Sequence, residues 1–390
     1  MNNDKIASLF QHYFPGNAEG IRLFFAPGRV NLIGEHTDYN GGYVFPAALT
    51  IGTYMAVRER ADQEFHLRSA NFKGDIHFSL QSLHYDRKDD WGNYPKGVIR
   101  ELLCYSQTIK GADIFYYGNL PNGAGLSSSA SIGMVTAFGL ASMNDIDLSM
   151  KELAYLCKRM ENHFIGVNSG LMDQVAVGFG KKDHAVFMNC KTTEIDQVLL
   201  QLPGYKLVIT NTNKRRDLAD SKYNERCKEC EEGLKAIQSF FPDKEVLGDL
   251  TLAEFEKVES AIFDSVVCRR IRHVVSENNR VLQTVKALER GDLLAVGREM
   301  IASHVSLRDD YEVTGKELDA LFEIQNSIDG CIGSRMTGAG FGGCTVSIVK
   351  EEEIEKFKKF VTERYEQMIG LTPSFYSSDI GDGVREWKGE

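Results

Sequence analysis

The residues with the richest chemistry occur near the start of the sequence. Glu35, His36, Thr37 and Asp38 are consecutive and supply two carboxylates, an imidazole and a hydroxyl, and Arg29 lies just upstream. Burying such a cluster is costly unless its members are paired or face a ligand. These groups suit a polyol, because each can hold one hydroxyl, and they equally suit a metal ion. A solvated polar turn is the remaining alternative, and this segment alone leaves all three open.

A second segment is rich in glycine and serine and lies between a strand-like run and a helical pattern. It contains Gly123, Ala124, Gly125, Leu126, Ser127, Ser128 and Ser129. Glycines let backbone N–H groups approach an anion, and a helix N-terminus adds a positive dipole end. Serine hydroxyls can donate to phosphates or ligate Mg²⁺, so the segment predicts a phosphate-binding loop. The alternative is a Ser-capped helix after a flexible loop. The sequence contains neither a P-loop motif nor the HRD and DFG motifs of protein kinases.

A third segment holds Gly338, Gly340 and Gly343, which match the pattern G-x-G-x-x-G. A dinucleotide-binding loop must follow a strand and open a helix. Here the glycines run into a β-type pattern at residues 345–349. We therefore expect a tight turn that packs on a ligand or on a neighbouring loop.

Length and charge narrow the class of protein. The 390 residues, 43% of them hydrophobic and 26% charged, are about right for two globular domains. The formal net charge of −10 argues against a general nucleic-acid surface, which needs clustered Lys and Arg. No apolar run approaches the ~18 residues of a membrane span, and the first residues lack a secretory-signal pattern. We therefore expect a protein that contacts neither nucleic acid nor membrane.

The eight cysteines are scattered, and Cys227 and Cys230 form the only closely spaced pair. This pair has no second pair and no His cluster at zinc spacing, which favours a structural interpretation over a metal or redox site. Reduced thiols in a cytoplasmic protein are the expectation.

Apolar patterns predict a mixture of strands and helices. Strands are expected near residues 23–25, 43–45, 51–57, 65–67, 76–78, 114–120, 186–188, 207–209 and 344–349. A helix containing residues 267–275 should end before Gly291, and Thr314 and Glu317 form a capping box that should open another helix. These elements predict an α+β protein with domains at 1–190 and 191–390.

The three segments, in this order, resemble the three motifs of the GHMP family of small-molecule kinases. The first resembles the signature of the galactokinase branch, which other members lack. Residues 166–174, 221–226 and 303–318 are also similar to that branch, so the resemblance covers nearly the whole chain. One departure is Ser169, where a cysteine is common, and Leu171 replaces an isoleucine. The resemblance implies a two-domain α+β fold with its active site in the cleft between the domains.

The resemblance also implies roles for single residues. Asp173 would be the catalytic base that faces the anomeric hydroxyl of the sugar, and Arg29 would stabilise the transition state beside it. The remaining implied contacts fall into three groups. Glu35, His36, Thr37, Asp38, Gly170 and Tyr223 would bind the sugar. Residues Gly123 to Ser129 would wrap the triphosphate, with Ser69 also touching the nucleotide. Ser129 and Glu161 would hold Mg²⁺.

The implied reaction is the ATP-dependent phosphorylation of D-galactose to α-D-galactose 1-phosphate, the entry step of galactose catabolism. Galactose and Mg-ATP would be the partners of a cytoplasmic monomer or weak oligomer. Three alternatives stay open. A sister kinase could act on N-acetylgalactosamine or arabinose. A silent sugar sensor is disfavoured because residues 127–130 are intact. A nicotinamide dehydrogenase would have to use the third segment.

Overall fold

The computed structural model describes residues 3–16, 18–121, 125–214 and 219–389. Its largest sheet has the strand order β13-β1-β3-β6-β4-β5. The strands of this sheet are β1 (Arg22–Asn31), β3 (Pro46–Glu59), β4 (Glu64–Ser69), β5 (Ile76–Ser79), β6 (Ala112–Gly118) and β13 (Arg385–Glu386). Neighbouring strands are antiparallel except for β4 and β6, which are parallel.

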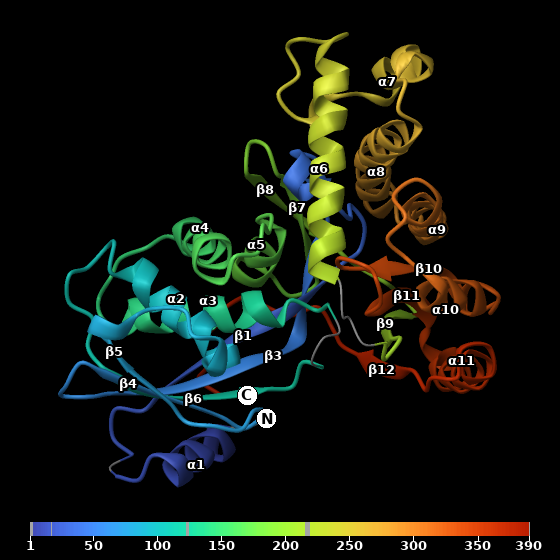
Figure 1. Ribbon diagram of the computed structural model, residues 1–390. Coiled ribbons are helices and arrows are strands. Elements are labelled where there is room, and N and C mark those ends of the chain that lie inside the picture. Colours follow the sequence, from blue (N-terminus) through green and yellow to red (C-terminus); the bar gives the residue numbers. More distant parts are fainter. Residues whose placement is uncertain (1–2, 17, 122–124, 215–218, 390) are drawn as a thin grey trace.

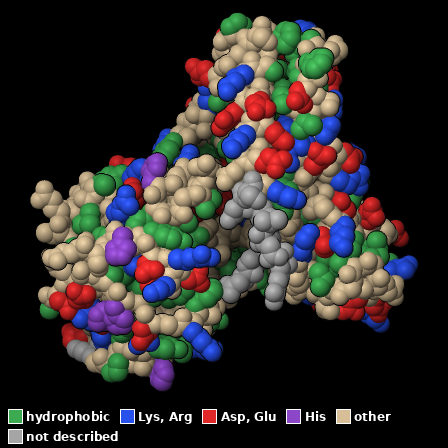
Figure 2. Space-filling view, in the orientation of Figure 1, with side chains coloured by type: hydrophobic (Ala, Val, Ile, Leu, Met, Phe, Trp, Pro, Cys, Tyr) green, Lys and Arg blue, Asp and Glu red, His purple; other side chains and the backbone are tan. Residues whose placement is uncertain are grey.

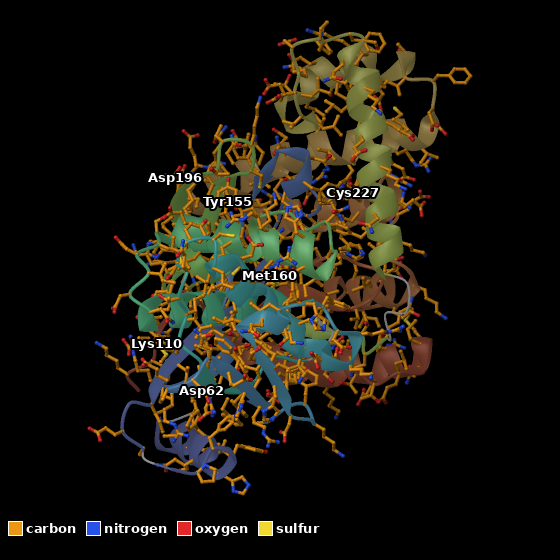
Figure 3. The ribbon with its side chains drawn as sticks, turned by 60° about the vertical axis from the view of Figure 1, so that its left-hand side comes forward. Asp62, Lys110, Tyr155, Met160, Asp196 and Cys227 are labelled. Atoms are coloured by element: carbon orange, nitrogen blue, oxygen red, sulfur yellow. The ribbon has the colours of Figure 1, made fainter. Side chains whose placement is uncertain are left out.

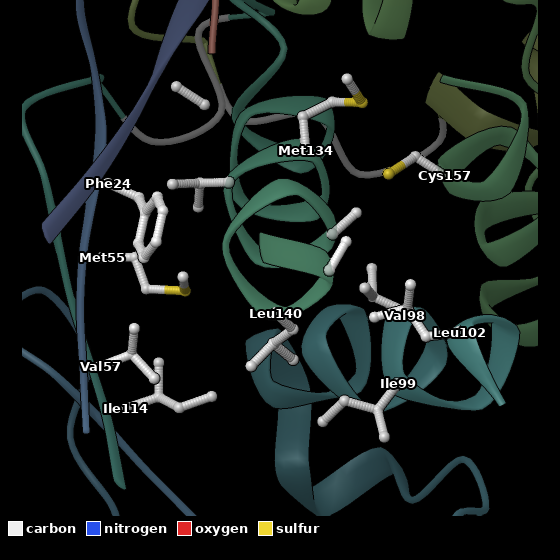
Figure 4. Close-up of a cluster of buried hydrophobic side chains, with 14 of the residues drawn as sticks. Phe24, Met55, Val57, Val98, Ile99, Leu102, Ile114, Met134, Leu140 and Cys157 are labelled. Carbon is white, nitrogen blue, oxygen red and sulfur yellow. The ribbon is translucent and has the colours of Figure 1, made fainter. Parts of the chain in front are cut away.

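Helices cover both faces of this sheet (Figure 1). One face carries α2 (Asn93–Leu102), α3 (Ser128–Met143), α4 (Met150–Met160) and α5 (Met172–Phe179), and the other carries α1 (Asn3–Tyr13). Helix α3 is apolar nearly all round because it is enclosed between the sheet and other helices. Figure 4 shows Met134 and Leu140 of α3 between Phe24 and Met55 of the sheet and Val98 of α2. Burying each such side chain contributes about 1.5–3 kcal/mol to folding stability. The core therefore holds α3 in place against the sheet.

The second half is built around a four-stranded sheet with the order β10-β11-β9-β12. Its strands are β9 (Tyr205–Asn211), β10 (Cys331–Thr337), β11 (Cys344–Lys350) and β12 (Ser374–Ser377). The helices of this half are α6 (Ala219–Gln238), α7 (Leu252–Val258), α8 (Ser265–Glu289), α9 (Leu293–Asp309), α10 (Lys316–Asn326) and α11 (Ile354–Ile369). Leu321 of α10 and Phe357 of α11 share a buried cluster with Val208 of β9. The helices therefore anchor this sheet on one side (Figure 1).

A small sheet with the order β2-β7-β8 completes the fold. It contains β2 (Tyr43–Val44), β7 (His184–Asn189) and β8 (Glu194–Leu199). The chain does not divide into two separate parts at residue 190, because its last strand, β13, pairs with β1 of the first sheet. Phe25 of β1 pairs with Arg385 of β13, and Leu49 forms a bridge with Ile380. The predicted boundary stays a prediction, but residues 380–386 pack with the N-terminal sheet.

The fold class predicted from the sequence, a mixed α+β architecture, is confirmed. Helix α8 includes residues 267–275 and ends before Gly291, as expected. The predicted capping box is wrong. Gly315 is the N-cap residue of α10. Glu317 instead accepts a 2.8 Å hydrogen bond from Lys214. Among the helices that the structure describes, none is long and apolar enough to span a membrane.

Candidate active site

A cavity of about 570 Å³ lies between the two halves of the molecule. It is lined by Arg29, Glu35, His36, Asp38, Tyr85, Tyr94, Ser129, Glu161, Ile165, Gly166, Val167, Ser169, Gly170, Met172, Asp173, Tyr223, Asn224, Gly338 and Ala339. Figure 2 shows a recess between the two parts of the molecule. Most of the residues singled out in the sequence therefore meet in one place.

Arg29 and Asp173 form an ion pair at this cavity. Arg29 lies on β1 beside an irregularity in the pairing with β3, and Asp173 lies in the first turn of α5. The Nε and Nη2 atoms of Arg29 lie 2.9 Å and 2.8 Å from Asp173 Oδ1. Its Nη1 atom donates a 2.6 Å hydrogen bond to the carbonyl oxygen of Gly125. The guanidinium is thus fixed between the carboxylate and the glycine-serine segment, and it is only 4% exposed.

The glycine-serine segment approaches the same carboxylate from the other side. Ser127 precedes α3 and has a left-handed backbone, with φ 59°. Its hydroxyl donates a hydrogen bond to Asp173 Oδ2. Ser129 lines the main cavity, while Gly123 and Ala124 lie outside the described residues. Helix α3 therefore begins at the junction between the Arg29–Asp173 pair and the predicted phosphate site.

The third segment forms the turn between the antiparallel strands β10 and β11. It opens no helix, which excludes the dinucleotide-loop interpretation. A Cβ atom at Gly338 would lie 3.0 Å from the carbonyl oxygen of Gly125, so this glycine lets the turn pack on the glycine-serine segment. The predicted packing of this turn on a neighbouring loop is confirmed.

Glu35 is buried where these segments meet, with 1% exposure. The backbone N–H of Gly338 donates a 2.7 Å hydrogen bond to its Oε1 atom, and Arg335 Nη2 lies 3.5 Å from the same oxygen. Burial raises the pKa of Glu35, while the guanidinium groups of Arg335 and Arg29 oppose that rise. The sequence reasoning missed Arg335, although an arginine inside the otherwise uncharged strand β10 was a visible signal.

His36 is enclosed by aromatic rings and stays neutral. Its ring centroid lies 5.0 Å from that of Tyr311 and 5.6 Å from that of Tyr223. Burial lowers the pKa of His36 to about 3. The Nε2 atom lies 3.3 Å from the carbonyl oxygen of Ala339, which can only accept, so Nε2 carries the proton. Nδ1 then accepts the 2.8 Å hydrogen bond of the Tyr39 hydroxyl.

Asp38 and Gly170 lie against each other at the cavity wall. A Cβ atom at Gly170 would lie 1.8 Å from Asp38 Oδ2, so no larger residue fits at position 170 without moving Asp38. Burial, followed by the charge of Asp173, raises the pKa of Asp38 to about 7. The carboxyl of Asp38 therefore holds its proton more tightly than an exposed aspartate does, because burial and a like charge act together.

Thr37 is the member of the tetrad that does not line the cavity. Its side chain is fully buried, and its Oγ1 atom lies 2.8 Å and 2.7 Å from the carbonyl oxygens of Gly34 and Tyr43. The hydroxyl therefore closes the turn that carries Glu35 and Asp38. A direct sugar contact of Thr37 stays a prediction from the resemblance.

Glu161 lines the cavity and is 5% exposed. It begins a π-helical turn, Glu161–Ile165, a feature that often marks functional sites. Oε1 is buried and has no hydrogen-bond partner among the described residues. With Ser129 it supplies the hard oxygen ligands that suit Mg²⁺. Within the described ranges no group of three His, Cys, Asp or Glu side chains could hold a metal, so phosphate oxygens would have to complete the coordination.

A second cavity of about 220 Å³ adjoins the first and shares Tyr94 and Ser129 with it. Its wall combines four aromatic side chains with polar groups and includes Ser69, the last residue of β4. The lining comprises Thr53, Ser69, Asn71, Phe72, Asp90, Trp91, Tyr94, Tyr116, Gly118, Leu120, Ser128, Ser129 and Ile132. The sequence reasoning missed Trp91 and Tyr94, which lie between the motifs and carry no spacing signal.

The cysteine pair lies on α6, where Figure 3 labels Cys227. Cys230 is buried, and its Sγ atom lies 3.0 Å from the hydroxyl of Tyr311. Burial raises the pKa of both thiols. The two thiols are therefore protonated packing groups at neutral pH, in agreement with the structural interpretation.

The chain is similar to known kinases along nearly its whole length. Residues 8–59 match the family described as the galactokinase galactose-binding signature, and residues 93–181 and 284–367 match the N-terminal and C-terminal domains of GHMP kinases. A galactokinase of Halalkalibacterium halodurans is 59% identical over 99% of this chain and 98% of its own length. The Bacillus subtilis galactokinase is 48% identical over 99% of this chain and 100% of its own length.

Solved structures show the same likeness. The crystal structure of Lactococcus lactis galactokinase complexed with galactose matches with a TM-score of 0.95 and 43% identity, covering 98% of this chain and 99% of that one. Methanococcus jannaschii mevalonate kinase, at 18% identity and a TM-score of 0.64, covers 93% of this chain and 98% of its own and shares the fold. With its signature, both kinase domains and full-length relatives in agreement, the chain belongs to the galactokinase family of GHMP kinases.

Proposed function

We propose that this protein transfers the γ-phosphoryl group of ATP to the anomeric hydroxyl of D-galactose, giving α-D-galactose 1-phosphate and ADP. The observation that carries the proposal is the Arg29–Asp173 ion pair. It lies in one cavity with the signature residues Glu35 and Asp38 and beside the glycine-serine segment. Galactokinase relatives at 48–59% identity over nearly the full chain support the same reaction.

The sugar site in this proposal is built from residues of both halves. Glu35 and Asp38 supply acceptors for sugar hydroxyls, and His36 and Tyr223 supply the aromatic wall. Gly170 leaves room for Asp38 to face the ligand. Thr37 holds the turn in this proposal, because its hydroxyl lies within hydrogen-bond distance of two backbone carbonyl oxygens and donates its single proton to them.

Asp173 is the proton acceptor in this proposal. The anomeric oxygen gives its proton to the carboxylate, forms the new bond to the γ-phosphorus, and the bond from phosphorus to the ADP oxygen breaks. Phosphoryl transfer passes through a loose transition state, so catalysis depends on positioning and charge neutralisation. Arg29 supplies a fixed positive charge beside the acceptor and stabilises the charge that develops.

The nucleotide binds in the neighbouring region. The aromatic cavity around Trp91 and Tyr94 suits a purine ring, and Ser69 lies on its wall. The triphosphate then reaches the N-terminus of α3, where the segment from Gly125 and Leu126 to Ser127, Ser128 and Ser129 lies. Gly123 and Ala124 are assigned to the triphosphate by sequence alone.

Mg²⁺ is held by Glu161 and Ser129 in this proposal. When bound, the ion neutralises phosphate charge. The structural feature that fits it is the Glu161 carboxylate, whose buried Oε1 atom accepts no hydrogen bond of normal geometry from the described residues and which interacts with the Ser129 hydroxyl. A monomeric or weakly oligomeric state and a cytoplasmic location stay predictions from the resemblance.

The reaction is tested by incubating the pure protein with ATP, Mg²⁺ and a panel of sugars, followed by phosphorus NMR of the product. We expect galactose 1-phosphate as the main product. A stronger product signal with N-acetylgalactosamine or arabinose would show that this sugar, and not galactose, is the preferred substrate. Sugar binding without any phosphorylated product would identify a sensor instead.

A further inference from the structure

The two oxygens of the Glu161 carboxylate have different surroundings. Oε2 accepts a 2.6 Å hydrogen bond from Ser169 Oγ and a 2.9 Å hydrogen bond from Gln174 Nε2. Oε1 is buried and accepts no hydrogen bond of normal geometry in the described part of the chain, although the Ser129 hydroxyl interacts with this carboxylate. One oxygen is therefore tied to the protein by two hydrogen bonds, while the other has only the weaker interaction with Ser129.

This asymmetry comes from how the chain runs around the cavity. Glu161 opens the π-helical turn after α4, and Ser169 lies on the loop that leads to α5. Gln174 is fully buried in the first half of α5. The two donors thus reach the carboxylate from outside its own helix and fix its orientation.

A buried carboxylate oxygen that accepts no hydrogen bond of normal geometry is unfavourable, because it has lost its water. A hard cation at Oε1 would offset that loss. The Ser169 hydroxyl is also close to Asn162 Oδ1, at 3.3 Å. The contact with Glu161 is shorter and charge-assisted, so it determines where the single hydroxyl proton points.

We propose that Ser169 and Gln174 are positioning residues for the divalent cation: they hold Oε2 of Glu161 so that Oε1 is presented as a monodentate metal ligand. This inference rests on the proposed metal role of Glu161. The hydroxyl of Ser169 suits this role, because a hydroxyl is a much stronger donor than a thiol. Loss of hydrogen-bond partners of metal ligands typically weakens metal binding by about 10–100-fold.

The test measures the binding of Mn²⁺ to the complex with ADP by electron paramagnetic resonance, which needs no turnover. We expect Ser169→Ala and Gln174→Met each to weaken Mn²⁺ binding by about 10-fold or more. Ser169→Cys, which keeps the size of the side chain, should weaken it in the same direction. Galactose affinity, measured by calorimetry on the same preparations, should stay within about 2-fold of the unmodified protein, a window chosen to exclude general distortion of the loop.

The variant Glu161→Gln distinguishes failure of the positioning role of Ser169 and Gln174 from failure of the metal assignment to Glu161. It should weaken Mn²⁺ binding by itself, and in that background Ser169→Ala should add nothing, because Ser169 acts through Glu161. If Glu161→Gln weakens binding while neither Ser169→Ala nor Gln174→Met does, the positioning role is refuted and the metal site stands. If Glu161→Gln leaves Mn²⁺ binding unchanged, the metal assignment itself is refuted. An equal loss of galactose affinity in Ser169→Ala would show a collapsed loop and also overturn the positioning role.

Discussion

Arg29 and Asp173 are 144 positions apart in the sequence, and two guanidinium nitrogens of Arg29 lie within 2.9 Å of one carboxylate oxygen, Asp173 Oδ1. The other oxygen, Oδ2, accepts a hydrogen bond from Ser127. Oδ1 is committed to the guanidinium. If Asp173 is the proton acceptor, as proposed, Oδ2 is therefore the oxygen that would take the proton, and Ser127 would share it with the substrate.

Replacing Asp173 with Asn keeps the shape of the side chain and removes its negative charge. We expect kcat to fall by at least about 10²-fold, the usual lower bound for loss of a general base. Galactose should still bind, which calorimetry checks independently. Turnover near that of the unmodified protein would remove Asp173 from the chemical step.

Arg29→Lys keeps a positive charge but cannot contact both Asp173 Oδ1 and the carbonyl oxygen of Gly125 in the same planar geometry. We expect kcat to fall by about 10²-fold, with smaller changes in the KM values for both substrates. Arg29→Ala should follow the same pattern with a larger loss. Steady-state kinetics decide the matter, because an effect confined to KM would show that Arg29 only binds substrate.

Ser129 and Ser128 provide a matched pair for the metal-nucleotide site. Ser129 lines both cavities, whereas Ser128 lines only the nucleotide-side cavity. Ser129→Ala should raise the concentrations of Mg²⁺ and ATP needed for half-maximal rate, at an unchanged KM for galactose. Ser128→Ala should change the ATP requirement without changing the Mg²⁺ requirement. Equal Mg²⁺ titration curves for the two variants would contradict the assignment of Ser129.

Asp38 makes galactose use sensitive to pH. Its pKa is raised to about 7 by burial and by the charge of Asp173, so it becomes protonated as the pH falls below about 7. If the ionised form holds a sugar hydroxyl, kcat/KM for galactose at saturating ATP should fall across pH 8 to 6. The Asp38→Asn variant should have lower activity and should lack this part of the profile. An unchanged inflection in that variant would assign the titration to another group.

The raised pKa of Asp38 also affects folding stability, which should fall as pH rises, whereas galactose use should increase. Because the carboxyl of Asp38 binds its proton more tightly in the folded state than in the unfolded state, folding stability falls as pH rises from about 4 to 7. Asp38→Asn should therefore raise Tm at pH 8 more than at pH 4. Thermal unfolding of both proteins in matched buffers measures the difference. A constant Tm difference across this range would show that Asp38 has an ordinary pKa.

Sugar choice follows from the buried signature residues. Galactose and glucose differ in the orientation of one hydroxyl, and an epimer would leave a buried acceptor unpaired at a cost of about 1–3 kcal/mol or more. A site built on hydrogen bonds to a hydroxyl can reject a ligand that lacks it by roughly 10⁴. We expect glucose to be used at least about 10³-fold less efficiently in kcat/KM. Comparable values for the two hexoses would mean that Glu35 and Asp38 do not read the sugar.

The sequence marked the contiguous motifs, and the structure brings residues of all three to one cavity. The tetrad, the glycine-serine segment and the glycine-rich turn each carry their chemistry within a few residues, but the resemblance, and not their types and spacing alone, selected the sugar-kinase interpretation. The resemblance supplied Asp173, Glu161 and Tyr223, which no local pattern marks. Trp91 was missed because its importance arises from tertiary contacts, whereas Arg335 was missed although a lone arginine within a strand was a visible signal. Local pattern also misled at Thr314, because the pairing of Glu317 with Lys214 replaced the expected helix cap.

The return of the last strand to the first sheet has a consequence for biosynthesis. Arg22 on β1 contacts Glu386 on β13 across 364 positions, and Trp387 packs with Phe25 in a buried cluster. A nascent chain cannot complete this sheet until residue 387 has left the ribosome, although domains generally begin to fold from the N-terminal end during synthesis. The edge of β1 that pairs with β13 therefore lacks its partner strand until residue 387 has left the ribosome.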